Sequence, residues 1–264
     1  MALPLRPLWL LTAALALVPG CARDAAPVNA GAELPAPPSA TDVLAAAVRA
    51  SGGEEALRAH QSCRMTGTFS MAAQGITGQM TLWSTAQGQV YSRVELEGIG
   101  RMEEGVDGGV PWSKDPLTGP RIKEGVEAVQ ALRAADFHQL LNLATHYPSA
   151  ETVGRGTLEG AAVYELRLTP TEGPPETWYF DVQSGLPVGS KVTLQTAMGD
   201  VTVTSVNSDF REIGGQVVPT QTTMTNSLMS TSIRWTEIVW DPPDLGMPPL
   251  PDDVRALIPP AASP

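Results

Sequence analysis

The sequence predicts a mainly β protein of the α+β class, in which a single curved antiparallel sheet of about ten strands carries a few short helices. Three observations predict it. Most segments after residue 62 alternate apolar and polar residues with period two. Short gaps with turn signals such as Asp107-Gly108-Gly109 separate these segments, which favours an antiparallel meander. One stretch between two groups of strands has helical spacing instead, and no change in composition divides the chain.

The first group of predicted strands carries one apolar face. These strands cover residues 62–71, 76–82, 90–96 and 99–106. Along the first three, aliphatic residues and methionines alternate with polar residues, which is typical of a sheet with one buried face. That face supplies the candidate ligand-binding residues Met65, Phe69, Met71, Ile76, Met80, Leu82, Val94 and Leu96. Because methionine also adapts well to a packed core, the stripe fits either an ordinary core or a ligand wall.

Short helices are predicted before the strands and between the two strand groups. Thr41 is the expected N-cap of a helix over residues 42–50, and a second short helix ends near His60. Two further apolar series with helical spacing begin at Ile122 and Phe137, and we expect them to cover the apolar face as a lid. The candidate lid residues are Val126, Val129, Leu132, Phe137, Leu140 and Leu141.

A second group of strands follows the helical stretch. Its predicted members cover residues 151–154, 161–170, 177–182, 188–196, 201–212, 217–225 and 229–240. The tail over residues 242–264 is rich in proline, with one short helix expected at Asp252–Ile258. Since the helices are short, the sheet either rolls up on itself or leaves part of its apolar concavity to a ligand.

The first residues resemble the leader of an exported bacterial lipoprotein. Arg6 precedes an apolar run from Leu8 to Val18, which is shorter than the roughly 20 residues that span a bilayer. Val18-Pro19-Gly20-Cys21 resembles a lipobox, which predicts a signal peptide over residues 1–20 and a lipid on Cys21. An ordinary secretory signal that carries a cysteine near its cleavage site is the alternative.

The residues that follow Cys21 indicate how and where the domain is attached. Residues 21–40 are rich in Ala and Pro and predict a disordered tether after the lipidated cysteine. Ala22, in place of an aspartate, resembles the pattern of lipoproteins sent to the outer membrane. We therefore expect a protein on the periplasmic face of the bacterial outer membrane, held to the membrane by its N-terminal lipid.

Charge and cysteine content exclude several classes of function. The formal net charge is −11, and removal of residues 1–20 deletes only Arg6 among the charged residues, which makes it −12. An acidic chain without a basic run is a poor match for nucleic acid or for anionic lipid surfaces. If Cys21 carries lipid, Cys63 has no disulfide partner, and we interpret it as a buried, inert thiol.

No catalytic pattern is found in the sequence. The three histidines, His60, His138 and His146, lack the spacing of a zinc site. Neither a Gly-x-Ser-x-Gly elbow nor a phosphate loop is present. We therefore predict no catalytic residue, no metal ligand and no cofactor, and interpret the protein as a non-enzyme. A hydrolase would need a nucleophile–base pair around His138 or His146 that the sequence does not reveal.

Several turn and strand signatures carry a family resemblance. They are Ser51-Gly52-Gly53-Glu54-Glu55-Ala56-Leu57, Met65-Thr66-Gly67-Thr68, Val106-Asp107-Gly108 with Trp112, Tyr179-Phe180-Asp181-Val182 with Gly185-Leu186, and Asp209-Phe210-Arg211-Glu212 with Gly215 and Pro219. With the order of helices, meander, helical insert and second meander, they resemble an uncharacterised lipid-anchored branch of the LolA/LolB-like superfamily. The resemblance implies a half-open β-barrel with a helical lid over residues 41–241.

Two functions follow from the resemblance and stay open. The first is a membrane-anchored envelope lipoprotein that binds a lipid or a lipoprotein acyl chain in the concave face of the half-barrel, without catalysis. A lipid on Cys21 would make it a fixed binder and not a free shuttle. The second is an envelope interaction module with the same fold and no ligand, the partner of a protease, a sensor or an assembly machine.

Overall fold

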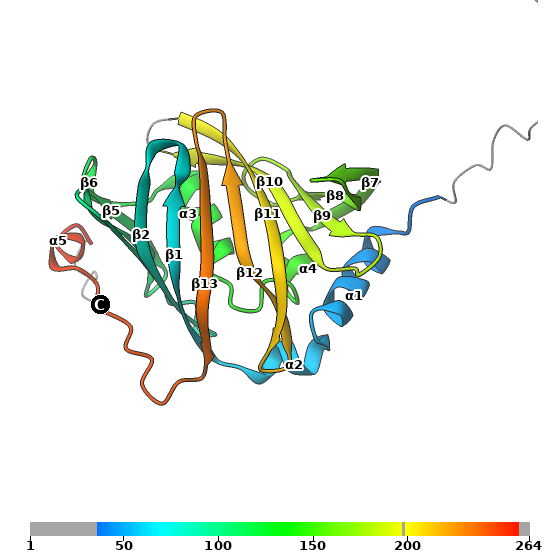
Figure 1. Cartoon of the computed structure of the whole chain (residues 1–264), viewed down its shortest axis with the longest axis horizontal. Coiled ribbons are helices and arrows are strands. Elements are labelled where there is room, and N and C mark those ends of the chain that lie inside the picture. Colours follow the sequence, from blue (N-terminus) through cyan, green and yellow to red (C-terminus); the bar gives the residue numbers. More distant parts are fainter. Residues whose placement is uncertain (1–35, 197–198, 259–264) are drawn as a thin grey trace, which may run out of the picture. The chain divides into compact units, whose positions relative to one another are not determined.

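Thirteen antiparallel strands form one continuous sheet in the computed structural model of the chain (Figure 1). The structure describes residues 36–196 and 199–258, so Cys21 and the predicted signal peptide lie outside the described residues. In the sheet, β1 (Ser62–Met71) pairs with β13 (Ser230–Trp240), and the two arms of the sheet extend from this pair in opposite directions. The described residues from Pro37 onward belong to one compact unit.

Each arm of the sheet is a meander of consecutive strands. The first arm continues from β1 through β2 (Ile76–Thr85), β3 (Val90–Leu96), β4 (Gly100–Asp107), β5 (Val110–Asp115) and β6 (Gly119–Ile122). The second arm runs back from β13 through β12 (Gln216–Thr225), β11 (Gly199–Ile213), β10 (Pro187–Thr196), β9 (Glu176–Asp181), β8 (Ala161–Thr169) and β7 (Ser149–Leu158). Within the described residues β6 and β7 are the two edges, so the sheet is not closed. This confirms the predicted curved, open half-barrel with a few short helices.

The count of about ten strands was too low because β5 and β6 were not predicted. Ile122, which we counted as the start of a helix, is instead the last residue of β6. Both strands are short and each contains a proline, Pro111 in β5 and Pro120 in β6. Proline has no backbone N–H to donate and interrupts the alternation from which strands are predicted.

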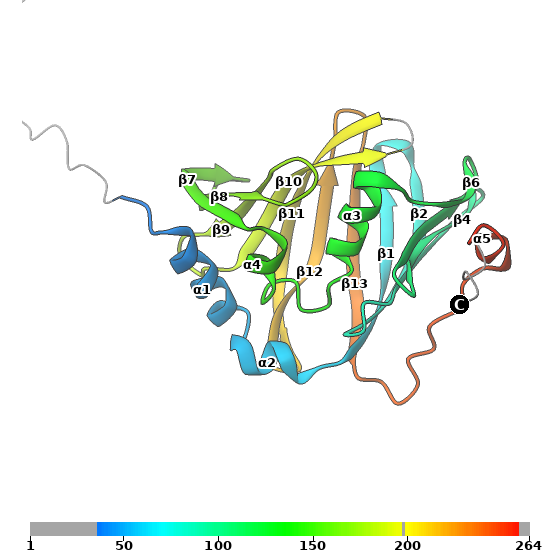
Figure 2. The ribbon, with the colours of Figure 1, turned by 180° about the vertical axis from the view of Figure 1, so that it is seen from behind.

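The connection between the two edges crosses the concave side of the sheet. It contains α3 (Gly125–Ala134) and α4 (Leu143–His146), which lie in front of the sheet in Figure 2. α3 contacts β4 and β5 of the first arm and β10 of the second. This helix therefore takes the position of the expected lid.

The helix predicted from Phe137 is mostly a series of turns. The carboxylate of Asp136 accepts a hydrogen bond from the backbone N–H of His138 at 2.9 Å and another from the side chain of Asn142 at 2.8 Å. The side-chain amide of Gln139 donates a hydrogen bond to the backbone oxygen of Arg133, and not to Asp136. Asp136 thus organises a turn, since aspartate side chains compete with helical hydrogen bonding.

Two N-terminal helices pack at one end of the second arm. α1 (Ala40–Ala50) begins earlier than predicted, because the hydroxyl of Ser39, and not of Thr41, accepts from the backbone N–H of Asp42 at 3.2 Å. α2 (Gly53–Ala59) follows after Gly52, whose φ of +117° favours glycine. The buried face of α1 belongs to a core cluster with β8, β9 and α4, formed by Ala40, Val43, Ala47, Leu143, Tyr147, Leu166, Leu168 and Phe180.

The C-terminal segment packs on the outer face of the first arm. It includes α5 (Asp252–Arg255), which occupies only the first part of the helix predicted at Asp252–Ile258. Leu250 and Val254 are buried in a cluster with Trp83, Tyr91 and Trp112. None of the helices in the described part of the chain has the length and hydropathy to cross a membrane.

Candidate apolar cavity

A hollow lies between α3 and strands β2, β3 and β4 of the first arm. It has a volume of about 230 Å³ and lies between the side chains of Met80 and Leu82 on β2 and the small side chains of Ala131, Ala134 and Ala135. β2 presents Met80 and Leu82 to this side because successive residues of a strand point to opposite faces. Since alanine ends at Cβ, the helix covers the strand but leaves space above it.

A second hollow of about 230 Å³ adjoins the first. Its walls include Cys63 and Met65 from β1, Phe137 from the turn after α3, and Trp240 from the end of β13. The two hollows share Leu82, Val90, Ala134 and Ala135. Each is smaller than the roughly 300 Å³ at which ligand pockets begin, but they adjoin and the walls of both are predominantly apolar.

The predicted ligand-binding residues divide between this cavity and the core. Met65, Met80 and Leu82 line the hollows. The other predicted residues lie in a separate core cluster around Ile233, and they are Phe69, Met71, Ile76, Val94 and Leu96, with Met80 at its margin. The core interpretation of the apolar stripe therefore holds for one part of it, and the other part lines a cavity.

Only one of the six predicted lid residues lines the two hollows. Phe137 does so and packs edge-to-face on Trp240, with ring centroids 6.1 Å apart. Leu140 packs against the core cluster of α1. The remaining lid residues are only partly buried or exposed and do not line the hollows: Val126, Val129, Leu132 and Leu141.

The helix face toward the cavity was missed because it consists of small residues. Ala131, Ala134 and Ala135 are spaced by three and four residues, which places them on one side of α3. We assigned the inner face to the larger residues Val129 and Leu132, but Leu132 is 42% exposed. The alanine spacing is the signal that would have indicated this face.

A buried ion pair fastens α3 to the second arm. Arg133 Nη2 lies 2.7 Å from Glu176 Oε1 on β9, and the two side chains are only 7% and 6% exposed. Glu176 Oε2 also accepts from Tyr147 Oη at 2.7 Å and from Trp178 Nε1 at 3.0 Å. Burial and the nearby charge of Glu176 raise the pKa of Tyr147. A fully bonded carboxylate is the condition under which such a buried pair is tolerated.

The carboxamide of Gln130 connects α3 to the same arm through two hydrogen bonds. It donates to Thr193 O at 2.7 Å and accepts from the backbone N–H of Gln195 at 3.1 Å. Pairing between β9 and β10 reaches only Lys191, so these backbone groups lie beyond the neighbouring strand. The side chain of Gln130 therefore acts as the missing strand partner. α3 is thus held on β9 and β10 and faces the first arm across the hollows.

His60 and His146 form hydrogen bonds within the fold, whereas the buried Nε2 of His138 has no hydrogen-bond partner among the described residues. His146 Nε2 lies 2.6 Å from Asp136 Oδ2, which is the base–orienter half of a hydrolase triad. Burial opposes ionisation of Asp136, but its bonds to His146, Asn142 and His138 lower its pKa. In the part of the chain that the structure describes, no Ser, Thr or Cys is recorded bonding to His146, and no cluster of metal-ligating residues occurs.

Cys63 has the character expected of an inert thiol. Its side chain is buried and free of any disulfide. Burial, assisted by the charge of Asp241, raises the pKa of Cys63 to about 12. Since the thiolate is the reactive form, this cysteine is not a nucleophile at neutral pH.

His60 joins three distant parts of the chain. Its Nδ1 lies 2.8 Å from Asp241 Oδ2, and its Nε2 lies 2.9 Å from Gly214 O. Both partners accept hydrogen bonds, so both bonds form only when the ring carries two protons. Burial works against this charge, but the bonds to Gly214 and Asp241 outweigh it and raise the pKa of His60 above 6.5.

The raised pKa of His60 predicts a pH-dependent contribution to stability. The contribution is fully present below the unfolded pKa of 6.5 and is lost as pH rises through the higher folded pKa. The difference in unfolding free energy between the native chain and His60→Gln should therefore shrink as pH rises from 6.5 through the folded pKa of His60. Urea denaturation at several pH values measures it. A difference that does not change with pH would contradict the charged His60.

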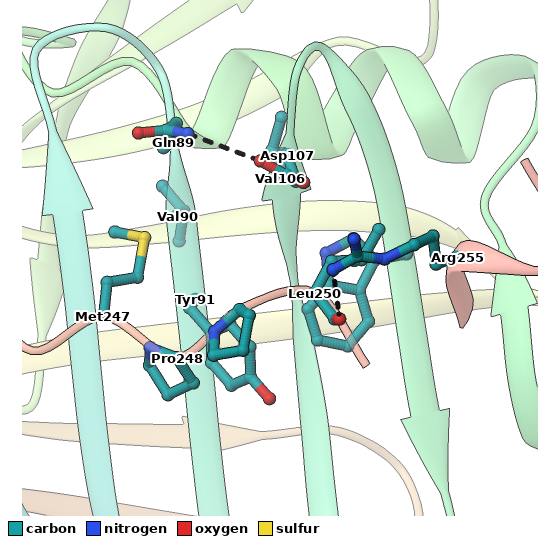
Figure 3. A pocket seen from close by; sticks show the side chains of 11 residues that line it. Gln89, Val90, Tyr91, Val106, Asp107, Met247, Pro248, Leu250 and Arg255 are labelled. Atoms are coloured by element: carbon teal, nitrogen blue, oxygen red, sulfur yellow. Dashed lines mark hydrogen bonds between the residues drawn. The ribbon is translucent and has the colours of Figure 1, made fainter. Parts of the chain in front are cut away.

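Another hollow, of about 370 Å³, lies on the outer face of the sheet. Tyr91 and Trp112 contribute to it from the strands, and Met247, Leu250 and Arg255 from the C-terminal segment (Figure 3). Arg255 Nη2 donates to Leu250 O at 3.1 Å, which closes the segment on itself. This hollow therefore lies between the strands of the first arm and the C-terminal segment, with Arg255 of α5 in its wall.

The described part of the chain is thus an open antiparallel half-barrel crossed by helices, with apolar hollows beneath them. More specifically, the chain has the fold of the LolA superfamily. A LolA superfamily protein from Nitrosomonas europaea is similar with a TM-score of 0.50 and 14% sequence identity, over 83% of this chain and 97% of that chain. A DUF1329 family protein from Desulfovibrio piger has a TM-score of 0.49 and 14% identity, over 76% of this chain and 93% of its own.

At 14% identity, the similarity to the LolA superfamily protein concerns the fold alone, because fold does not determine function. No family model and no curated protein sequence matches the chain.

Proposed function

We propose that the protein is a non-catalytic lipoprotein of the bacterial envelope that holds a lipid or a lipoprotein acyl chain between α3 and the first arm of the sheet. The observation that carries this proposal is the pair of adjoining hollows between the alanine face of α3 and Met65, Met80 and Leu82. An apolar chain placed there would gain about 25 cal/mol for each Å² of apolar surface removed from water.

The attachment of α3 supports a site that can admit a chain. Arg133 and Gln130 fix the helix to the second arm, which leaves the hollows between its alanine face and β2 unfilled. Methionines at two wall positions, Met65 and Met80, can adjust to ligands of different shape. An interaction module without ligand would favour a filled cavity, whereas the hollows described above are open.

The predicted lipid on Cys21 would hold this site close to a membrane, which favours a fixed binder on the outer membrane over a shuttle. A single acyl chain anchors only weakly, whereas the several chains of a mature lipoprotein anchor stably. Fractionation of bacterial membranes tests the anchor, because a Cys21→Ser chain should appear in the soluble periplasmic fraction.

Filling the cavity should abolish ligand binding. Ala134 lines both hollows, so the indole of an Ala134→Trp variant should occupy the space and weaken binding of a fluorescent fatty-acyl probe by at least about tenfold, or 1.4 kcal/mol. Titration of the probe into the full chain measures this, and mass spectrometry of gently purified protein identifies any lipid that copurifies.

Ala144→Trp is the matched control, because Ala144 is an exposed residue of α4 that lines neither hollow. It should bind the probe as the native chain does. The proposal fails if the native chain binds no probe and carries no lipid, or if Ala134→Trp binds as tightly as Ala144→Trp.

A further inference from the structure

The apolar hollow between β2 and α3 contains one cationic group, Lys123. This residue lines the hollow with Ser92 and Glu104, while the other wall residues are apolar or glycine. Its backbone N–H donates to Pro111 O at 2.9 Å, which fixes the chain between the end of β6 and the start of α3. The side chain of Lys123 is only 13% exposed.

The two partners of the Lys123 ion pair differ in their exposure to solvent. Its Nζ lies 2.8 Å from Glu104 Oε2, but the side chain of Glu104 is 59% exposed. The cation therefore lies inside the hollow and the anion lies at its rim. An ammonium group has three hydrogens to donate, and the described residues provide Nζ with this one recorded acceptor. A buried ammonium is stabilised when more of its hydrogens find acceptors.

The other end of the cavity offers no comparable cation. The second hollow contains one charged residue, Asp136, whose carboxylate already accepts bonds from His138, Asn142 and His146. The remaining walls of that hollow are largely apolar, with Met65, Phe137 and Trp240 among them. The two ends of the cavity therefore differ: Lys123 places a cation in the wall of one hollow, and the other hollow has no cation in its largely apolar wall.

We infer that the cavity recognises a single-chain amphiphile with an anionic head, a carboxylate or a phosphate. The head binds Lys123 Nζ and replaces Glu104, whose exposed carboxylate turns to solvent. The chain lies against Met80, Leu82 and the alanines of α3 and extends toward Trp240. This inference rests on the proposed function and narrows it, since the ester- and amide-linked acyl chains of a lipoprotein lack an anionic head.

Three probes of equal chain length test the inference on the full chain: laurate, dodecyl phosphate and dodecanol, each below its micelle concentration. We expect displacement of a fluorescent acyl probe to show at least one of the two anions binding about tenfold more tightly than the alcohol. Which anion is preferred distinguishes a fatty acid from an alkyl phosphate. Lys123→Met, which keeps an unbranched side chain, should bind all three with the affinity of the alcohol.

Two further variants sharpen the test. Glu104→Gln removes the competing anion and should tighten binding of laurate or dodecyl phosphate but not of dodecanol. Lys191→Met removes an exposed lysine of β10 outside the hollows and should change nothing. Equal affinity of the native chain for all three probes, or an undiminished preference in Lys123→Met, overturns the head-group inference while the binding function stands. If none of the probes binds, both fail.

Discussion

Arg133→Met is expected to lower the free energy of unfolding by about 3–5 kcal/mol, because it leaves the carboxylate of Glu176 buried without its cation. The two groups lie 2.7 Å apart and are almost inaccessible to water. Tyr147 and Trp178 would still donate to Glu176, but neither can neutralise its charge. Denaturant unfolding followed by tryptophan fluorescence measures the loss.

A double-mutant cycle separates the ion pair from simple packing. Arg133→Met/Glu176→Gln removes both charges, so it should recover much of the stability that either single change costs. Arg167→Met is the control, because Arg167 and Glu151 are both exposed and 3.5 Å apart, and such surface pairs contribute about 0–1 kcal/mol. A loss in Arg133→Met no larger than in Arg167→Met would show that the buried pair does not hold α3.

The consequence for ligand entry follows from where α3 is fastened. Arg133 and Gln130 both connect it to the second arm, and the hollows separate it from β2. On the edge side, Arg121 Nη1 of β6 and Glu127 Oε2 of α3 form an ion pair at 2.7 Å, which also lowers the pKa of Glu127. Because β6 belongs to the first arm, α3 is tied to both arms, and a ligand would enter where the hollows separate the helix from β2.

The strand pattern could be predicted from the sequence because alternation depends on neighbouring residues. The segments predicted at 62–71, 90–96 and 229–240 match β1, β3 and β13 to within one residue. Alternation also identified which residues share a face. It could not indicate how far along that face the lid extends, so Val94 and Met80 were assigned alike although one is core and the other also lines a cavity.

The lid could not be predicted in the same way, since its contacts join residues far apart in the chain. Arg133 can be buried because it pairs with Glu176, and Gln130 because it hydrogen-bonds to Thr193. These partners lie 43 and 63 positions later in the sequence, respectively. A hydrophobic pattern assigns such polar residues to the solvent side of a helix. For this reason the prediction placed the larger apolar residues of α3 toward the sheet. In the structure, the alanines face the cavity instead.

Val254→Asp is expected to detach the C-terminal segment from the outer face of the sheet, with a loss of about 2–5 kcal/mol. Val254 is fully buried in the cluster with Trp83, Tyr91 and Trp112. A carboxylate there would be buried among apolar side chains, and a short segment can avoid that cost by leaving the sheet. Tryptophan emission should then shift to longer wavelength, and proteases should cleave after residue 242.

Leu257→Asp is the control for this change, since Leu257 is an exposed residue of the same segment and should tolerate the charge. Unaltered emission and protease resistance in Val254→Asp would contradict the packing of the segment.

Binding of the acyl probe gives an independent readout. Trp83 follows Leu82 directly in β2, so the two side chains lie on opposite faces of one strand. If the outer segment and the inner cavity are independent, Val254→Asp lowers the free energy of unfolding but leaves the affinity for the acyl probe unchanged. Ala134→Trp should do the reverse.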